Sequence, residues 1–164
     1  MSRLDSFIRR LEAQRACLDL AAGAIGDQAG TVLELGLGNG RTYDHLRERL
    51  PAREIIVFER EVRAHPDCVP DEDHLVLGAI EDTLPAFAES RSGDAVLIHS
   101  DIGTGDALRN KKLAAWLSAA LPPLLRPGAW VAADQALSDA SFAEQPLPEG
   151  VAKGRYYLYR YMPA

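Results

Sequence analysis

The chain has 164 residues, the length of one domain, and 47% of them are hydrophobic, which is enough to bury a core. Its formal net charge is −6, and its 18 basic residues are scattered, which argues against a nucleic-acid backbone as partner because such binding depends on clustered Lys and Arg. The sequence has neither a membrane-length apolar run nor the apolar core of a signal peptide, so we expect a cytoplasmic protein.

The first predicted element is an amphipathic helix over residues 2–25. Its apolar side consists of Leu4, Phe7, Ile8, Leu11, Leu18 and Ala22. Such a side is expected to cover a sheet.

The most informative segment follows this helix. An apolar strand over residues 31–35 leads into Gly36, Gly38 and Gly40, and a helical pattern begins directly afterwards with Tyr43 and Leu46. Glycines are needed where the backbone takes a positive φ or where a ligand lies against the main chain. The start of the helix adds unpaired N–H groups and the positive end of its dipole. The loop is therefore suited to hold a ligand against its backbone.

The spacing of these glycines distinguishes between cofactors. The nicotinamide fingerprint is G-x-G-x-x-G, whereas the third glycine here comes one residue early, and the lysine of a phosphate-binding Walker loop is missing. The remaining pattern, E-x-G-x-G-x-G, resembles motif I of the class I S-adenosylmethionine-dependent methyltransferases. A dinucleotide loop and a purely structural turn are the alternatives. The resemblance implies that the cofactor is bound by Glu34, Gly36, Leu37, Gly38, Asn39, Gly40, Arg41 and Thr42.

A second acidic position supports a nucleoside cofactor. Residues 54–58 read as a buried strand, and Glu59 stands at its end, 19 residues beyond Gly40. In doubly wound folds an acid at this point accepts hydrogen bonds from ribose hydroxyls. A solvated loop acid is the alternative, because Arg60 and Glu61 make the stretch generally charged. Glu59 and Arg60 are counted as cofactor-binding candidates, although nicotinamide enzymes share this feature.

The third strand, residues 75–78, is followed by a segment that borders the adenine in the methyltransferase family. The family often has an acid directly after the glycine, but this chain has Ala79. Glu81, Asp82 or backbone groups could replace it. The resemblance implies cofactor contacts at Ala79, Ile80 and Glu81.

Residues 94–101 resemble the family's fourth strand, which ends beside the transferred methyl group. Leu113, Trp116, Leu117 and Leu121 mark a further helix, interrupted at Pro122. Residues 124–130 then resemble the helix-end turn L-x-P-G-G that leads into the fifth strand, with Ala129 in place of the second glycine. Five pieces thus match the family in the right order between residues 31 and 135.

The last part of the chain has two segments. Residues 136–153 are poorly patterned and are expected to form a loop, which is a candidate for the acceptor side or a plain surface loop. Residues 154–162 alternate as a strand, with Tyr157, Tyr159 and Tyr161 on one face, and resemble the family's late antiparallel strand. We predict an α/β, doubly wound, Rossmann-like methyltransferase fold over residues 1–164, with a mostly parallel seven-stranded sheet and helices on both faces.

The candidate catalytic residues stand at the end of the fourth strand. His99 is a candidate general base, and Asp101 is positioned to orient the acceptor. The resemblance also makes His99 and Ser100 cofactor-binding candidates. The alternative is that His99 packs there or bonds the cofactor. Cation-dependent catechol-type methyltransferases bind magnesium at the positions of His99, Asp134 and Gln135. Histidine is a poor magnesium ligand, so we expect no metal, although Asp101 could substitute.

The predicted function is methyl transfer from S-adenosyl-L-methionine to an unidentified acceptor, which we expect to be a small molecule. The acceptor is expected to be held by short loops, by the N-terminal helix, which the family often places over the cofactor, or by a second subunit in a homo-oligomer. The alternatives are a non-catalytic cofactor-binding module, a subunit of a modification complex and a nicotinamide-linked oxidoreductase.

Overall fold

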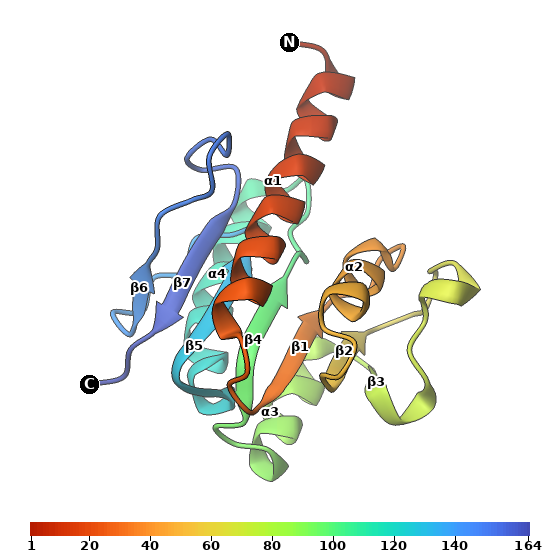
Figure 1. Cartoon of the computed structure of the whole chain (residues 1–164), viewed down its shortest axis with the longest axis vertical. Helices are drawn as coiled ribbons and strands as arrows, with labels where there is room; N and C mark the ends of the chain where they lie inside the picture. Colours follow the sequence, from red (N-terminus) through yellow and green to blue (C-terminus); the bar gives the residue numbers. More distant parts are fainter.

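The computed structural model describes all 164 residues, which form a seven-stranded sheet in the order β3-β2-β1-β4-β5-β7-β6 between two layers of helices. The strands are β1 (Thr31–Leu35), β2 (Ile55–Glu59), β3 (Leu75–Leu77), β4 (Ala95–Ser100), β5 (Leu125–Ala133), β6 (Phe142–Glu144) and β7 (Tyr157–Tyr161). The helices are α1 (Arg3–Ile25), α2 (Arg41–Arg49), α3 (Ile80–Ser90) and α4 (Ala107–Ala120). Figure 1 shows the arrangement of these elements.

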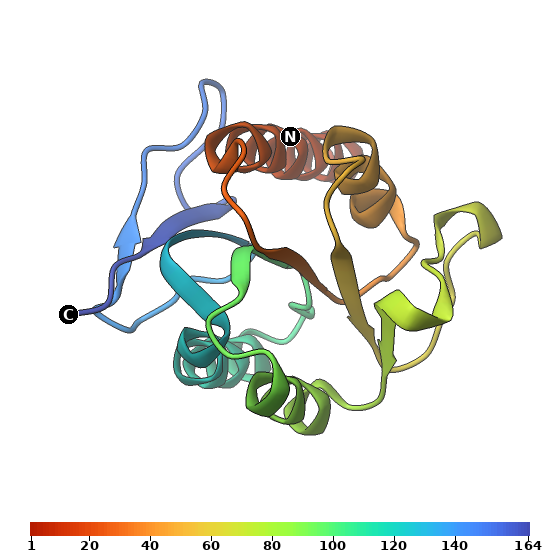
Figure 2. The ribbon, with the colours of Figure 1, turned by 60° about the horizontal axis from the view of Figure 1, so that its bottom comes forward.

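The sheet is covered on both faces, which explains its apolar central strands. Helices α1 and α2 lie on one face and α3 and α4 on the other (Figure 2). Every residue of β1 and β4 is buried, as expected for parallel strands that are packed on both sides. Strand β7 runs antiparallel to β5 and β6, whereas β1 to β5 pair in parallel. The predicted mostly parallel sheet with an antiparallel late strand is confirmed.

The strand order places a topological switch point between β1 and β4. From β1 the chain proceeds through β2 and β3 toward one edge, and from β4 it proceeds toward the other. Doubly wound sheets bind ligands at this point, outside the carboxyl ends of the strands. Glu59 ends β2, and Gly36, Gly78, Asp101 and Asp134 directly follow β1, β3, β4 and β5. The fold therefore brings the motifs found in the sequence to one edge of the sheet.

Helix α1 begins and ends as its sequence predicts. Ser2 accepts a hydrogen bond from the backbone N–H of Asp5 and the Asp5 side chain accepts one from that of Ser2, which makes a capping box. Leu18 is buried against the sheet, whereas Leu4 and Phe7 are 66% and 46% exposed. Figure 1 shows the N-terminal half of α1 projecting past the sheet. Only the second half of the helix therefore has the covering role predicted for the whole.

Two segments differ from the sequence-based prediction. The loop predicted over residues 136–153 contains the short strand β6, which pairs with β7. The segment after residues 75–78, in which no helix was predicted, is helical from Ile80 onward, with Pro85 inside the helix. Its helical form is explained by Leu84, which is fully buried beneath the sheet, and by the φ of proline, which suits a helix at the cost of one hydrogen bond. No helix is both long enough and apolar enough to cross a membrane.

Candidate functional site

Glycine is required at the three positions of the loop after β1 for different structural reasons. All have positive φ, but a Cβ atom on Gly36 would lie 2.5 Å from Ile102 Cγ2, and one on Gly40 would lie 2.5 Å from Cys68 Cβ. A Cβ on Gly38 would meet no atom within 4 Å. Gly36 and Gly40 are therefore needed for packing, whereas Gly38 borders open space in which a ligand can lie against the backbone.

The carboxylate of Glu59 closes back on the same loop. Its Oε2 accepts hydrogen bonds from the backbone N–H groups of Leu37 and Gly38, at 2.8 and 3.1 Å. Its Oε1 accepts from those of Arg60 and Glu61, at 2.7 and 3.3 Å. Burial acts to raise the pKa of Glu59, but these four bonds outweigh it and hold the pKa below its usual range. Glu59 is therefore ionised at neutral pH, and its two longer bonds are the ones that ligand hydroxyls could replace.

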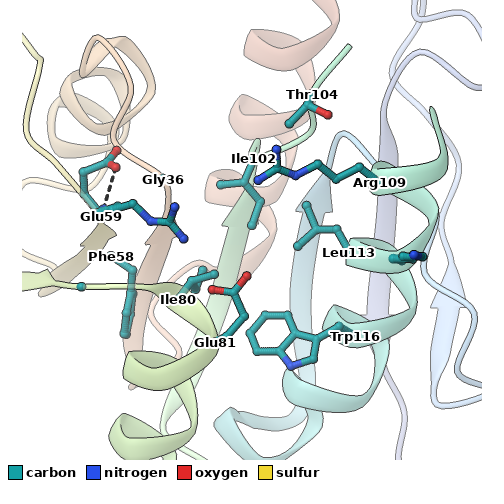
Figure 3. A pocket seen from close by; sticks show the side chains of 13 residues that line it. Gly36, Phe58, Glu59, Ile80, Glu81, Ile102, Thr104, Arg109, Leu113 and Trp116 are labelled. Carbon is teal, nitrogen blue, oxygen red and sulfur yellow. Dashed lines mark hydrogen bonds between the residues drawn. The ribbon is translucent and has the colours of Figure 1, made fainter. Parts of the chain in front are cut away.

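A cavity of 430 Å³ adjoins Glu59 at the carboxyl edge of the sheet. Figure 3 shows Phe58 and Ile80 on one side of it and Ile102, Leu113 and Trp116 on the other. This volume is in the range of small-molecule sites, about 300–1,000 Å³. An apolar slot beside an ionised carboxylate is suited to a flat ring that is attached to a hydroxylated group.

The structure brings only some of the predicted cofactor residues to this cavity. Those that line it are Gly36, Glu59, Arg60, Ile80 and Glu81. Ala79 caps α3 and does not line it. Glu81 is therefore the acid that can face an adenine amine, as the sequence allowed.

The remaining residues of the glycine loop lie elsewhere. Leu37 is 3% exposed and Gly40 is also buried, whereas Asn39 is exposed at the turn. Arg41 and Thr42 begin α2 and line a second hollow, of 400 Å³, between α1 and α2. Direct cofactor contacts by these residues stay predictions.

Sequence reasoning missed the wall of the cavity that α4 provides. Leu113 and Trp116, three residues apart on this helix, read as core positions, and Ile102 follows a strand without any motif. Their spacing identifies a helix face but not what the face covers. No signal in the sequence alone shows whether such a face packs in the core or borders a cavity.

A fully buried hydrogen-bonded chain lies beneath the glycine loop. His99 Nδ1 is 2.7 Å from Glu34 Oε2, and His99 Nε2 is 2.5 Å from the Tyr156 hydroxyl. The other oxygen of Glu34 accepts a bond from Thr42. None of Glu34, His99 and Tyr156 is more than 1% exposed. Glu34 and His99 thus support the loop and the strand end from within, and any direct contact of either with a ligand stays a prediction.

The surroundings of this buried chain shift the pKa values of His99 and Tyr156. Burial disfavours the charged imidazole, but the Glu34 carboxylate outweighs it, so the pKa of His99 is raised. Burial also raises the pKa of Tyr156 well above its ordinary value. Both ring nitrogens of His99 are occupied, so a role as general base would require one of these bonds to break. Tyr156 could not be identified as a polar partner from the sequence, because it shares one face of the predicted strand with Leu158 and has the pattern of a core position.

This pair predicts a pH-dependent stability. Because the pKa of His99 is raised by folding, its contribution is fully present below the ordinary histidine pKa, about 6.5, and is lost as pH rises through the folded pKa. We expect the free energy of unfolding, measured with urea across this window, to fall more steeply for the wild type than for His99→Gln. Glu34→Gln, which removes the carboxylate instead, should flatten the profile likewise. Equal slopes in all three proteins would contradict the assignment.

Asp101, directly after β4, is held by α1. Its Oδ1 accepts a hydrogen bond from Arg10 Nη2 and its Oδ2 accepts one from Gln14 Nε2, both at 2.6 Å. Gln14 is 6% exposed and reaches the Tyr156 hydroxyl as well, at 3.4 Å. The N-terminal helix therefore fixes the carboxylate that the sequence assigns to the acceptor.

Asp134 lies close enough to Asp101 to feel its charge. Burial, and then the charge of Asp101, raise the pKa of Asp134. Its Oδ2 accepts bonds from the Gly103 backbone N–H and from Gln135 Nε2, at 3.0 and 3.3 Å, whereas its buried Oδ1 has no partner. This second carboxylate could hold a proton that leaves an acceptor.

The positions that matched the magnesium ligands of the catechol-type enzymes are occupied differently. His99 faces Glu34 and Tyr156, and Gln135 turns its amide N–H toward Asp134. No group of three or more His, Cys, Asp or Glu side chains is placed to hold a metal ion. Whether the reaction needs a metal stays a prediction, addressed in the Discussion.

The sheet order, the antiparallel β7 and the cavity at the switch point place the chain in the Rossmann-like methyltransferase fold class. The model of the S-adenosyl-L-methionine methyltransferase family matches residues 1–161, and the chain belongs to that family. The protein is thus an S-adenosyl-L-methionine-dependent methyltransferase, as the motifs predicted, and the nicotinamide-linked alternative is set aside.

Solved structures agree with this assignment. The chain is similar to the S-adenosyl-L-methionine methyl transferase from Silicibacter pomeroyi DSS-3, at 43% identity over 98% of this chain and 99% of that one, with a TM-score of 0.93. Cofactor-bound Rv0187 from MTB shares the fold, at 19% identity over 96% of this chain and 88% of that one, with a TM-score of 0.56. No curated protein sequence matches the chain significantly.

Proposed function

We propose that this enzyme methylates a small-molecule acceptor that binds against Asp101, between α1 and the loop before β7. The cavity residues fit the cofactor. Ile80, Ile102 and Trp116 would hold the adenine, and Glu59 would accept the ribose hydroxyls in place of its two longer bonds. The open space beside Gly38 leaves room for the rest of the cofactor.

The chain's own residues supply alignment and a destination for a proton. When bound, the cofactor provides a methyl group that is already electrophilic because it is attached to a sulfonium, so the enzyme needs mainly to hold a nucleophile close to it. Asp101, fixed by Arg10 and Gln14, would orient the acceptor. Asp134, whose pKa is raised, would take the acceptor's proton where one must leave.

The observation that carries this proposal is the confined setting of the two carboxylates. Asp134 Oδ1 is buried without a partner beside Asp101, and helix α1 and short segments bound the site. Because the Asp101 side chain is only 21% exposed, a compact acceptor fits this place better than a protein or nucleic-acid surface.

Turnover with a panel of small alcohols, thiols, amines and acids tests the proposal, with S-adenosylhomocysteine measured by mass spectrometry. We expect one chemical class to support its formation. Glu59→Ala serves as the cofactor-site control and should weaken S-adenosylhomocysteine binding by roughly 1.5–3 kcal/mol, the range for hydrogen bonds to a charged group. Turnover only with proteins or RNA, or unchanged affinity in the Glu59 variant, would contradict the proposal.

A further inference from the structure

A small basic hollow lies where α1 meets the loop before β7. Its volume is 430 Å³, and its lining residues are Arg10, Ala152, Lys153, Gly154 and Arg155. Three of these five carry a positive charge and none carries a negative one, in a chain whose net charge is −6. The hollow is therefore basic although the protein as a whole is acidic.

The hollow is built by a tight turn rather than by freely moving side chains. The backbone N–H of Arg155 bonds the Ala152 carbonyl at 3.1 Å, and Gly154 between them has a φ of 82°, which favours glycine. Arg155 Nη1 donates to the hydroxyl and carbonyl oxygens of Ser6, at 3.2 and 3.4 Å. Figures 1 and 2 show the loop before β7 running beside α1. The turn therefore fixes the backbone from which Lys153 and Arg155 project, and Ser6 holds the Arg155 guanidinium in place.

These cations retain donors for a ligand. Neither Lys153 nor Arg155 forms an ion pair, and Arg10 uses only Nη2 for its bond to Asp101. Arg10 therefore connects the hollow directly to the carboxylate assigned to the acceptor. A molecule anchored in the hollow would extend naturally toward Asp101.

We propose that the acceptor carries an oxyanion, a carboxylate or a phosphate, which binds Arg10, Lys153 and Arg155 while its nucleophilic atom faces Asp101. The proposal rests on the proposed function and names its substrate class. Guanidinium and ammonium groups are the usual partners of such anions. The adjoining hollow is lined by three acids, Glu12, Asp19 and Glu149, and by three arginines, Arg9, Arg15 and Arg155. Because these charges balance, the positive charge does not continue beyond the turn as an extended polyanion would need, so a small anion fits better than a nucleic acid.

The test follows backbone amide signals by NMR in isotope-labelled protein saturated with S-adenosylhomocysteine, during titration with inorganic phosphate and, separately, with acetate. We expect saturable shifts at Lys153, Gly154 and Arg155. The affinity should fall roughly tenfold or more in the double variant Lys153→Gln/Arg155→Gln, which loses two charged donors. Stronger binding of phosphate or of acetate indicates which oxyanion the acceptor carries. Lys111→Gln on α4, an exposed cation on the opposite face, is the matched control and should bind both as the wild type does.

Three results would overturn the proposal. The first is the absence of saturable shifts at the turn, or equal affinity in the double variant. The second is weaker S-adenosylhomocysteine binding in the double variant, which would assign the hollow to the cofactor's own carboxylate. The third is a short RNA that binds these residues more tightly than either anion. If S-adenosylhomocysteine fails to bind the wild type, the proposed cofactor site is contradicted instead, and titration without it still reports on the hollow.

Discussion

Replacing Gly38 by valine should abolish binding of S-adenosylhomocysteine while leaving the protein folded. Gly38 has a φ of 53°, and the space where a side chain would stand is open beside the Glu59 carboxylate. The valine side chain would occupy the path of the ligand along the loop. We expect affinity, measured by calorimetry, to fall roughly 100-fold or more, where each factor of ten is about 1.4 kcal/mol.

The positive φ makes a strain control necessary. A non-glycine residue in the left-handed region costs about 1–2 kcal/mol of stability wherever it occurs. Gly93 has a φ of 66° and similarly open surroundings, but it lies before β4, at the opposite edge of the sheet. Gly93→Val should thus lose comparable stability in urea and keep full affinity. Normal binding by a folded Gly38→Val protein would remove the glycine loop from the cofactor site.

The motifs that the sequence revealed are those whose chemistry is local. A glycine at a strand end and an acid after the next strand act on backbone and ligand groups within a few residues of themselves. Their residue types and spacing can therefore be recognised before the fold is known. The parallel sheet then brings Gly38, Glu59 and Asp101 to one edge, as predicted. The resemblance to a family added the order of the strands.

The parts that escaped prediction depend on contacts between distant segments. No motif marks Gln14 or Tyr156 in the sequence, yet both are polar partners in the buried network around His99 and Asp101. Nothing near Tyr156 in the sequence indicates that a histidine will face its hydroxyl. The same applies to Trp116, whose ring borders the cavity only because α4 packs beside α3.

His99 shows how position alone can mislead. It stands at the end of the fourth strand, where a base is wanted, but its side chain points into the α1 face of the sheet and is fully buried. Asp101, two residues further, lies on the same face and is partly exposed. The alternation of a strand puts both on one side, and only the depth of each, set by α1, separates a supporting residue from one that can meet an acceptor.

Asp101→Asn should slow methyl transfer strongly while S-adenosylhomocysteine affinity stays close to that of the wild type. Asparagine keeps the size of the side chain but removes the charge that Arg10 and Gln14 orient. Because Asp101 is proposed to orient the acceptor, turnover should fall roughly 10²-fold, the loss expected when a reacting group is misplaced by about 1 Å. Glu12→Gln, an exposed acid on α1 that makes no hydrogen bond, controls for the loss of one negative charge.

Three further measurements separate the roles at this site. An Asp134→Asn variant that loses more turnover than Asp101→Asn would identify Asp134, with its raised pKa, as the proton acceptor and leave Asp101 an orienting role. If His99 instead acts as base, activity should rise with pH and His99→Gln should flatten that rise.

A chelator should leave the wild-type rate unaffected. Activity lost with the chelator and restored by magnesium would contradict the metal-free mechanism. It would require Asp101 to leave Arg10 and Gln14, and Asp134 and Gln135 to turn from each other toward an ion.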